Sequence, residues 1–133
     1  MLMKIDLESD EPIYRQIERQ VIEGIAYGRL KYGEKLPSVR RLAAELGINL
    51  HTVNKAYLVL KNEGFISILR QKGVVINRKR SVPGLELDKY IDRLKDELKP
   101  LIMEAYCRGI ELENVKSACD EIYKDLQKGG SDL

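Results

Sequence analysis

The chain has 133 residues, with 23 Lys and Arg side chains against 21 Asp and Glu. No apolar run reaches the roughly 18 residues that span a bilayer, and the N-terminus lacks a signal-peptide pattern, so we expect a cytoplasmic protein without a membrane partner. The near balance of charge hides an asymmetry: residues 28–80 hold 12 basic and 3 acidic side chains, whereas residues 81–133 hold 8 and 12. This asymmetry indicates an anionic partner, such as nucleic acid, for the first part of the chain.

Catalytic and metal-binding signatures are missing from the sequence. It contains no Walker A, GxGxxG, GxSxG or HExxH motif, so we expect neither an enzyme nor a cofactor. The single histidine, His51, and two isolated cysteines, Cys107 and Cys119, argue against a zinc site and favour reduced thiols. A thiol or metal switch that uses the two cysteines stays open as an alternative.

A first helix follows residues 1–10, which form an arm or a strand. We expect this helix to begin at Glu11 and Pro12, with the proline at the first helical position, and to end near Gly28. Apolar residues recur every fourth position along it and predict one buried stripe: Ile13, Ile17, Val21 and Ile25. Residues 28–37 contain two glycines and a proline and are predicted to be a loop.

Two further helices and a tight turn occupy residues 38–63. Ser38 is a good N-cap for the first of them, and Gly47 is a typical terminator. Asn49 is a good N-cap for the second, which Gly64 closes. The inward faces are predicted to be Val39, Leu42, Ala43 and Leu46 in the first helix and Val53, Ala56, Tyr57 and Leu60 in the second. This arrangement is the helix-turn-helix pattern.

A β-hairpin is predicted directly after these helices. Residues 65–70 and 74–77 are rich in β-forming side chains, and residues 71–73 between them form a turn with a basic tip. Such a hairpin is the wing of a winged helix. Residues 78–84 then read as a basic linker, which is either a further contact with an anionic partner or a solubilising spacer.

The remainder is predicted to be helical. Apolar residues spaced alternately by four and three form a heptad seam: Leu87, Ile91, Leu94, Leu98, Leu101 and Ala105. Pro100 is expected to kink this helix or to split it, and Gly109 to end it. A last helix carries Val115, Cys119, Ile122 and Leu126, and residues 129–133 are expected to be a frayed tail. The seam requires a partner surface, which is either a second copy or the wing domain of the same chain.

The exposed face of the helix that begins at Asn49 predicts the function. Its polar side chains and one cation suit the edges of bases in the major groove, while the arginines of the preceding helix and the wing tip lie within reach of the DNA. The predicted DNA-binding residues are Ser38, Arg40, Arg41, Asn49, Leu50, His51, Thr52, Asn54, Lys55, Lys72 and Gly73. An RNA-binding or protein-interaction module is the alternative, because winged helices also serve those roles.

Several motifs resemble the GntR family of bacterial transcription regulators, and in particular its short YtrA-like branch. They are the PIYRQI run from Pro12, the GEKLPSVR run from Gly33, the LAAELG run from Leu42 and the NLHTVNKAY run from Asn49. The resemblance covers roughly residues 11–77. Many family members carry Arg where this chain has Leu50 and Asn54.

The resemblance implies an α+β fold in which a winged helix-turn-helix domain, residues 1–80, precedes a small helical dimerisation region, residues 81–133. It implies a homodimer that represses transcription from an inverted-repeat operator through recognition helix 49–63 and wing 65–77. Little length remains for an effector domain, so the existence of an inducer stays open. The predicted dimer interface is Leu87, Ile91, Leu94, Leu98, Leu101, Val115, Cys119 and Ile122.

Overall fold

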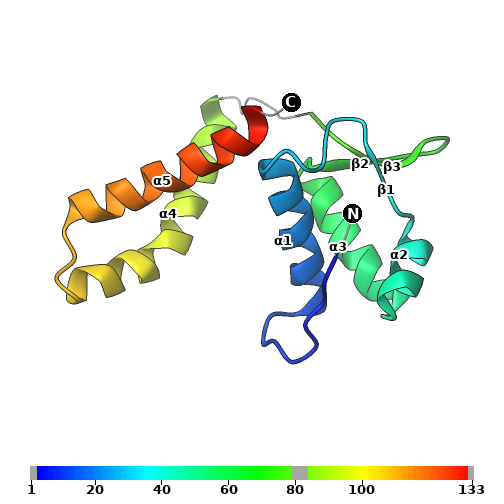
Figure 1. Cartoon of the computed structure of the whole chain (residues 1–133), viewed down its shortest axis with the longest axis horizontal. Helices are drawn as coiled ribbons and strands as arrows, with labels where there is room; N and C mark the ends of the chain where they lie inside the picture. The colour runs from blue at the N-terminus through cyan, green and yellow to red at the C-terminus, as the bar shows by residue number, and fades with distance from the viewer. Residues whose placement is uncertain (1–2, 79–83, 132–133) are drawn as a thin grey trace. The chain divides into compact units, whose positions relative to one another are not determined.

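The fold is taken from a computed structural model that describes residues 3–78 and 84–131 (Figure 1). Its elements are α1 (Ile13–Ala26), β1 (Lys35–Leu36), α2 (Val39–Leu46), α3 (Leu50–Asn62), β2 (Ile66–Leu69), β3 (Gly73–Ile76), α4 (Gly84–Cys107) and α5 (Leu112–Ser131). They form two compact units: α1–α3 with the sheet, and α4 with most of α5. This is the expected α+β winged-helix fold with C-terminal helices. Most of the predicted linker, residues 79–83, lies outside the described residues.

The core of the first unit lies between α1, α3 and the sheet. Val53, Ala56, Tyr57 and Leu60 are at most 1% exposed, which confirms the predicted inward face of α3. On α1 the predicted stripe is deepest in its middle, because Ile17 and Val21 are fully buried and its two outer members are half-buried. Burial of these large apolar side chains is the main source of stability for the unit.

The start of α1 differs slightly from the prediction, because Pro12 is the residue that caps the helix and Ile13 is the first helical residue. Residues 3–10 form an arm without a strand. The buried Gln16 amide fixes this arm: its Nε2 donates to the carbonyl oxygens of Asp6 and Glu11, both at 2.9 Å, and its Oε1 accepts from the Asp6 backbone N–H at 2.8 Å. These three hydrogen bonds therefore attach the N-terminal arm to the first turns of α1.

Both predicted caps of the helix-turn-helix are present. The Ser38 Oγ accepts a hydrogen bond from the Arg41 backbone N–H at 3.2 Å, and the Asn49 Oδ1 accepts one from the His51 N–H at 2.8 Å. Between the two helices, Gly47 has a φ of +66°, a left-handed conformation that glycine adopts without strain. These local signals set the short α2–α3 connection.

The wing hairpin is part of a three-stranded antiparallel sheet with strand order β1-β3-β2. The hairpin itself was expected, but Lys35 and Leu36 were predicted to lie in a loop and instead form β1, paired with Val75 and Val74 of β3. A strand of two residues is too short to show the alternation of apolar and polar side chains that identifies a strand in a sequence. It arises from pairing with β3, to which Gly33 and Glu34 add backbone hydrogen bonds with Ile76 at 2.9 Å.

In the second unit, α4 runs without a break through Pro100, so of the two predicted outcomes, a kink or a split, the split does not occur. Gly109 has a φ of +74° in the turn after α4, as expected for the residue that ends it. Helix α5 continues to Ser131, so residues 129–131 are helical and the predicted frayed tail is wrong for them; residues 132–133 lie outside the described part. None of the described helices is both long and apolar enough to cross a membrane.

Candidate nucleic-acid interface

The first two turns of α3 present a polar face to solvent. Leu50, His51, Asn54 and Lys55 are exposed, because the opposite face of the helix is buried in the core. Thr52 was predicted to point outward with them but is half-buried, since its position on the helix lies beside the buried face. The exposed set offers one cation, an imidazole, an amide and one apolar side chain. These groups match the donors, acceptors and thymine methyl groups of the major groove.

Arg40 and Arg41 lie in the first turn of α2, and both are exposed. The Nε of Arg41 is 2.9 Å from the Oε1 of Glu45, one turn along the same helix. Among the described residues no ion pair involves Arg40. The guanidinium of Arg40 is thus the more available of the two for an anionic partner.

Ser38 and Asn49 each use one oxygen for capping, and each side chain retains a donor: the hydroxyl of Ser38 and the amide N–H₂ of Asn49. Both side chains lie at the beginning of a helix, where backbone N–H groups and the helix dipole favour a phosphate. Ser38 and Asn49 can therefore cap their helices and contact a DNA phosphate at the same time.

Tyr57 connects α3 to the beginning of α2. Its hydroxyl donates a hydrogen bond to the carbonyl oxygen of Pro37 at 2.7 Å. Burial raises the pKa of the Tyr57 phenol well above its usual value, and the Glu45 carboxylate raises it further, so the group remains a donor. This bond fixes the residue before Ser38, and thereby the direction of α2, relative to the exposed face of α3.

Lys72 lies in the turn between β2 and β3, Gly73 is the first residue of β3, and both are exposed. Gly73 has a φ of +74°, so a side chain there would strain the turn. The base of the hairpin is fixed by Asn77, whose Oδ1 accepts from the Ser67 hydroxyl at 2.7 Å and whose Nδ2 donates to the Gly64 carbonyl at 3.0 Å. The basic tip is therefore carried on a tethered hairpin.

Two features beside this face were absent from the sequence prediction. Leu58 is 43% exposed and continues the row of His51 and Lys55, a position that the helical spacing of three and four residues could have revealed. The ring of Tyr14, in α1, lies under the Lys55 ammonium, with 3.9 Å between the Nζ and the ring centroid. That contact depends on how α1 packs against α3, and sequence spacing within one helix carries no signal for it.

The predicted dimer residues lie on α4 and α5 with much of their apolar surface exposed. Between Gly84 and Leu126 none of the described side chains is buried, and Val115 is among the few that are half-buried. Cys119 is exposed. The exposed fractions of the apolar seam residues range from 36% to 64%: Leu87, Ile91, Leu94, Leu98, Leu101 and Ile122.

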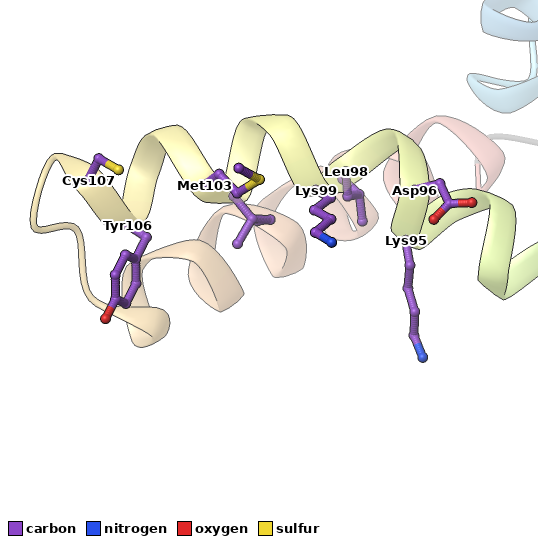
Figure 2. Close-up of a pocket in the computed structure, with 8 residues that line it drawn as sticks. Lys95, Asp96, Leu98, Lys99, Met103, Tyr106 and Cys107 are labelled. Atoms are coloured by element: carbon purple, nitrogen blue, oxygen red, sulfur yellow. The ribbon is translucent and has the colours of Figure 1, made fainter.

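A groove of about 750 Å³ follows α4 (Figure 2). Besides Leu98, its apolar lining comes from Ile102, Met103 and Tyr106, which the heptad seam did not include. The seam passes through Leu101, whereas the groove uses the neighbouring positions. A strict heptad pattern therefore underestimates the apolar surface of this helix.

Comparisons with known proteins place the chain among bacterial regulators. The family described as "Bacterial regulatory proteins, gntR family" matches residues 13–76. The HTH-type transcriptional repressor YtrA of Bacillus subtilis is 40% identical over 129 residues, which is 97% of each chain. A transcriptional antiterminator structure from Listeria monocytogenes aligns with a TM-score of 0.77 at 31% identity, covering 95% of this chain and 92% of that one. The structure of YtrA from Sulfolobus acidocaldarius, a GntR-family transcription factor, aligns with a TM-score of 0.59 at 36% identity. The alignment covers 94% of this chain and 99% of that one.

Proposed function

The chain belongs to the gntR family of bacterial regulatory proteins, and we propose that it represses transcription by binding an inverted-repeat DNA operator as a homodimer. As a DNA-binding regulator it works in the cytoplasm, where the bacterial chromosome lies. The observation that carries the proposal is the exposed polar face of α3, a capped helix whose opposite face is buried in the core and which is followed by a basic wing. The near full-length similarity to a named repressor supports the direction of regulation.

In this proposal the first two turns of α3 enter the major groove. His51 and Asn54 contact base edges, and Leu50 contacts a thymine methyl group. Arg40 reads a guanine or a phosphate from α2, and Lys72 enters the adjacent minor groove from the wing tip. The accessible side chains, the Tyr57–Pro37 bond and the tethered hairpin support these roles. Ser38 and Asn49 contribute phosphate contacts at the helix starts.

We assign dimerisation to α4 and α5. Monomeric proteins rarely expose a large contiguous apolar surface. Here the exposed seam residues lie on α4 and α5, and the groove of Figure 2 lies on α4. A second copy would cover this surface through matching residues, as two-fold symmetry requires. The two DNA-reading units would then meet half-sites about one helical turn, roughly 34 Å, apart.

The experiment is selection of duplex DNA from a random pool by the full chain, followed by binding measurements at several salt concentrations. We expect an inverted repeat among the selected sequences. We also expect log K to fall with log salt by about 0.9 for each phosphate that a cation neutralises. Selected sequences without two-fold symmetry would contradict the dimeric reader. Equal affinity for RNA of matched sequence would favour the nucleic-acid module without operator specificity.

A further inference from the structure

Tyr14 lies in the first turn of α1, outside the helix-turn-helix and the wing, yet its ring touches the recognition helix. The Lys55 Nζ is 3.9 Å from the ring centroid, well inside the roughly 6 Å at which a cation is attracted by the face of an aromatic ring. Tyr14 is half-buried and packs against the core, so the ring itself is fixed. The ammonium of an exposed lysine is thus held by a ring that another helix positions.

Lys55 is the only lysine or arginine in the first two turns of α3. Among the described residues no carboxylate forms an ion pair with it, so its charge is available to DNA. A free lysine side chain loses rotamer freedom when it binds a partner, and this loss weakens binding. A ring that already restricts the side chain reduces that loss, while the ammonium keeps donors that point away from the ring.

The same ring has a second cation beside it. The Cζ of Arg15 is 5.4 Å from the Tyr14 centroid, and its Nη1 is 3.3 Å from the Oε2 of Glu18. Glu18 is only 6% exposed, and its Oε1 has no hydrogen-bond partner among the described residues. The Glu18 carboxylate, with Tyr14 as a lesser cause, raises the pKa of the Arg15 guanidinium. Arg15 is therefore occupied by a buried carboxylate, whereas Lys55 is not.

We propose that Tyr14 is a positioning residue for operator binding, which holds the Lys55 ammonium at the DNA-facing side of α3. This inference rests on the proposed function. It adds a residue of α1 to the binding machinery, and it assigns that residue an effect that passes through Lys55. The role requires the face of the ring and not the hydroxyl, because the attraction comes from the π electrons.

The test is a double-mutant cycle on the full chain, with a duplex selected from a random pool as the probe. Tyr14→Leu should weaken binding about three- to tenfold, whereas Tyr14→Phe, which keeps an aromatic face, should change it less than about twofold. In the Lys55→Ala background, Tyr14→Leu should have no further effect, because the cation that the ring positions is gone. Tyr27→Leu is the matched control: it removes a similar contact with Arg29, at 5.1 Å, from the residue that follows the last turn of α1.

The outcomes separate this proposal from the function on which it rests. A wild-type chain that selects no DNA overturns both. If Lys55→Ala weakens binding but the Tyr14→Leu effect simply adds to it, Tyr14 acts on the fold and the positioning role is wrong. The same holds if Tyr14→Phe loses as much affinity as Tyr14→Leu. Unfolding by denaturant, measured on each variant, supplies the stability against which these affinities are compared.

Discussion

Two neighbouring arginines at the start of α2 have the same charge but different surroundings. Arg41 is paired with Glu45 at 2.9 Å, whereas no ion pair of Arg40 occurs among the described residues. An exposed ion pair contributes little to stability, about 0–1 kcal/mol, but it must be given up before the guanidinium can bind elsewhere. At this scale the candidate site is therefore divided into side chains that are available and side chains that are already engaged.

We predict that Arg40→Ala weakens operator binding by about 1–3 kcal/mol, as expected for the loss of a bidentate contact to a base. Arg41→Ala should cost less than about half of that, because this side chain must first leave Glu45. Both variants lose one positive charge, so each is the electrostatic control of the other. Fluorescence anisotropy with the selected duplex measures the difference, and equal losses would show that the pairing with Glu45 is irrelevant to binding.

At the scale of the element, the arrangement of α2 against α3 depends on one buried bond. The Tyr57 hydroxyl donates to the Pro37 carbonyl at 2.7 Å, and the ring is fully buried. Because burial raises the pKa of the phenol in the folded state above its value of about 10 in the unfolded chain, the folded state binds the proton more tightly. The resulting stability is complete below pH ~10 and is lost as the pH rises further.

We therefore predict that Tyr57→Phe lowers the free energy of unfolding by about 1 kcal/mol at pH 7, where the hydrogen bond is lost. Above pH ~10 the wild type should lose stability faster than the variant, so that the gap between them narrows. Urea unfolding at pH 7 and at several values above 10 measures this. Tyr106→Phe is the matched control, because its side chain is 82% exposed. A gap that stays constant with pH would refute the assignment.

The elements that sequence reasoning predicted are those whose signals are local. Ser38, Gly47 and Asn49 each act within a few residues, so the caps and the turn of the helix-turn-helix were predicted correctly. Strand β1 was missed because Lys35 and Leu36 become a strand only by pairing with residues of β3, far along the chain. The helical end of α5 was missed because the glycines at 129 and 130 are weak helix formers, and local propensity predicted fraying.

In the candidate site, too, sequence reasoning predicted the features that depend on local signals and missed those that depend on contacts between distant residues. The exposed face of α3 followed from the buried positions on its other side, apart from the half-buried Thr52. Tyr14 did not follow, because its contact with Lys55 exists only when α1 and α3 are packed together. Glu18 also gave no sign of being buried, since a glutamate in an amphipathic helix is ordinarily assigned to the solvent face. Contacts between helices are thus the part that a single sequence leaves undetermined.

For the whole molecule, the opposed charges of the two parts of the chain agree with the two tasks proposed for them, DNA binding and dimerisation. The basic segment, residues 28–80, carries the candidate DNA contacts, and the acidic segment, residues 81–133, carries the exposed apolar seam. An acidic surface is repelled by DNA phosphates, so it is suited to protein contacts. If α4 and α5 join two copies, operator affinity depends on them without any contact of theirs to DNA, because two linked units bind two half-sites together.

We predict that Leu98→Glu separates the two copies. Leu98 lies on the seam and also lines the groove of Figure 2, and it is 39% exposed in the single chain, so a charge there spares the core of the DNA-reading unit. In a dimer the same substitution would place two carboxylates in an apolar contact, where an unpaired charge is costly. Sedimentation equilibrium should give twice the chain mass for the wild type and the chain mass for the variant.

A control variant, Leu7→Glu, and binding measurements with operator DNA test the same prediction. Leu7→Glu introduces the same charge at a leucine of the N-terminal arm that is 76% exposed, and it should leave the mass unchanged. With the selected inverted repeat, Leu98→Glu should bind roughly 100-fold more weakly than the wild type, whereas on a duplex with one half-site the two should bind alike, because only bivalent binding is lost. A variant that remains a dimer would remove the α4–α5 seam from the interface. Loss of binding to the single half-site would instead show that the substitution damages the DNA-reading unit.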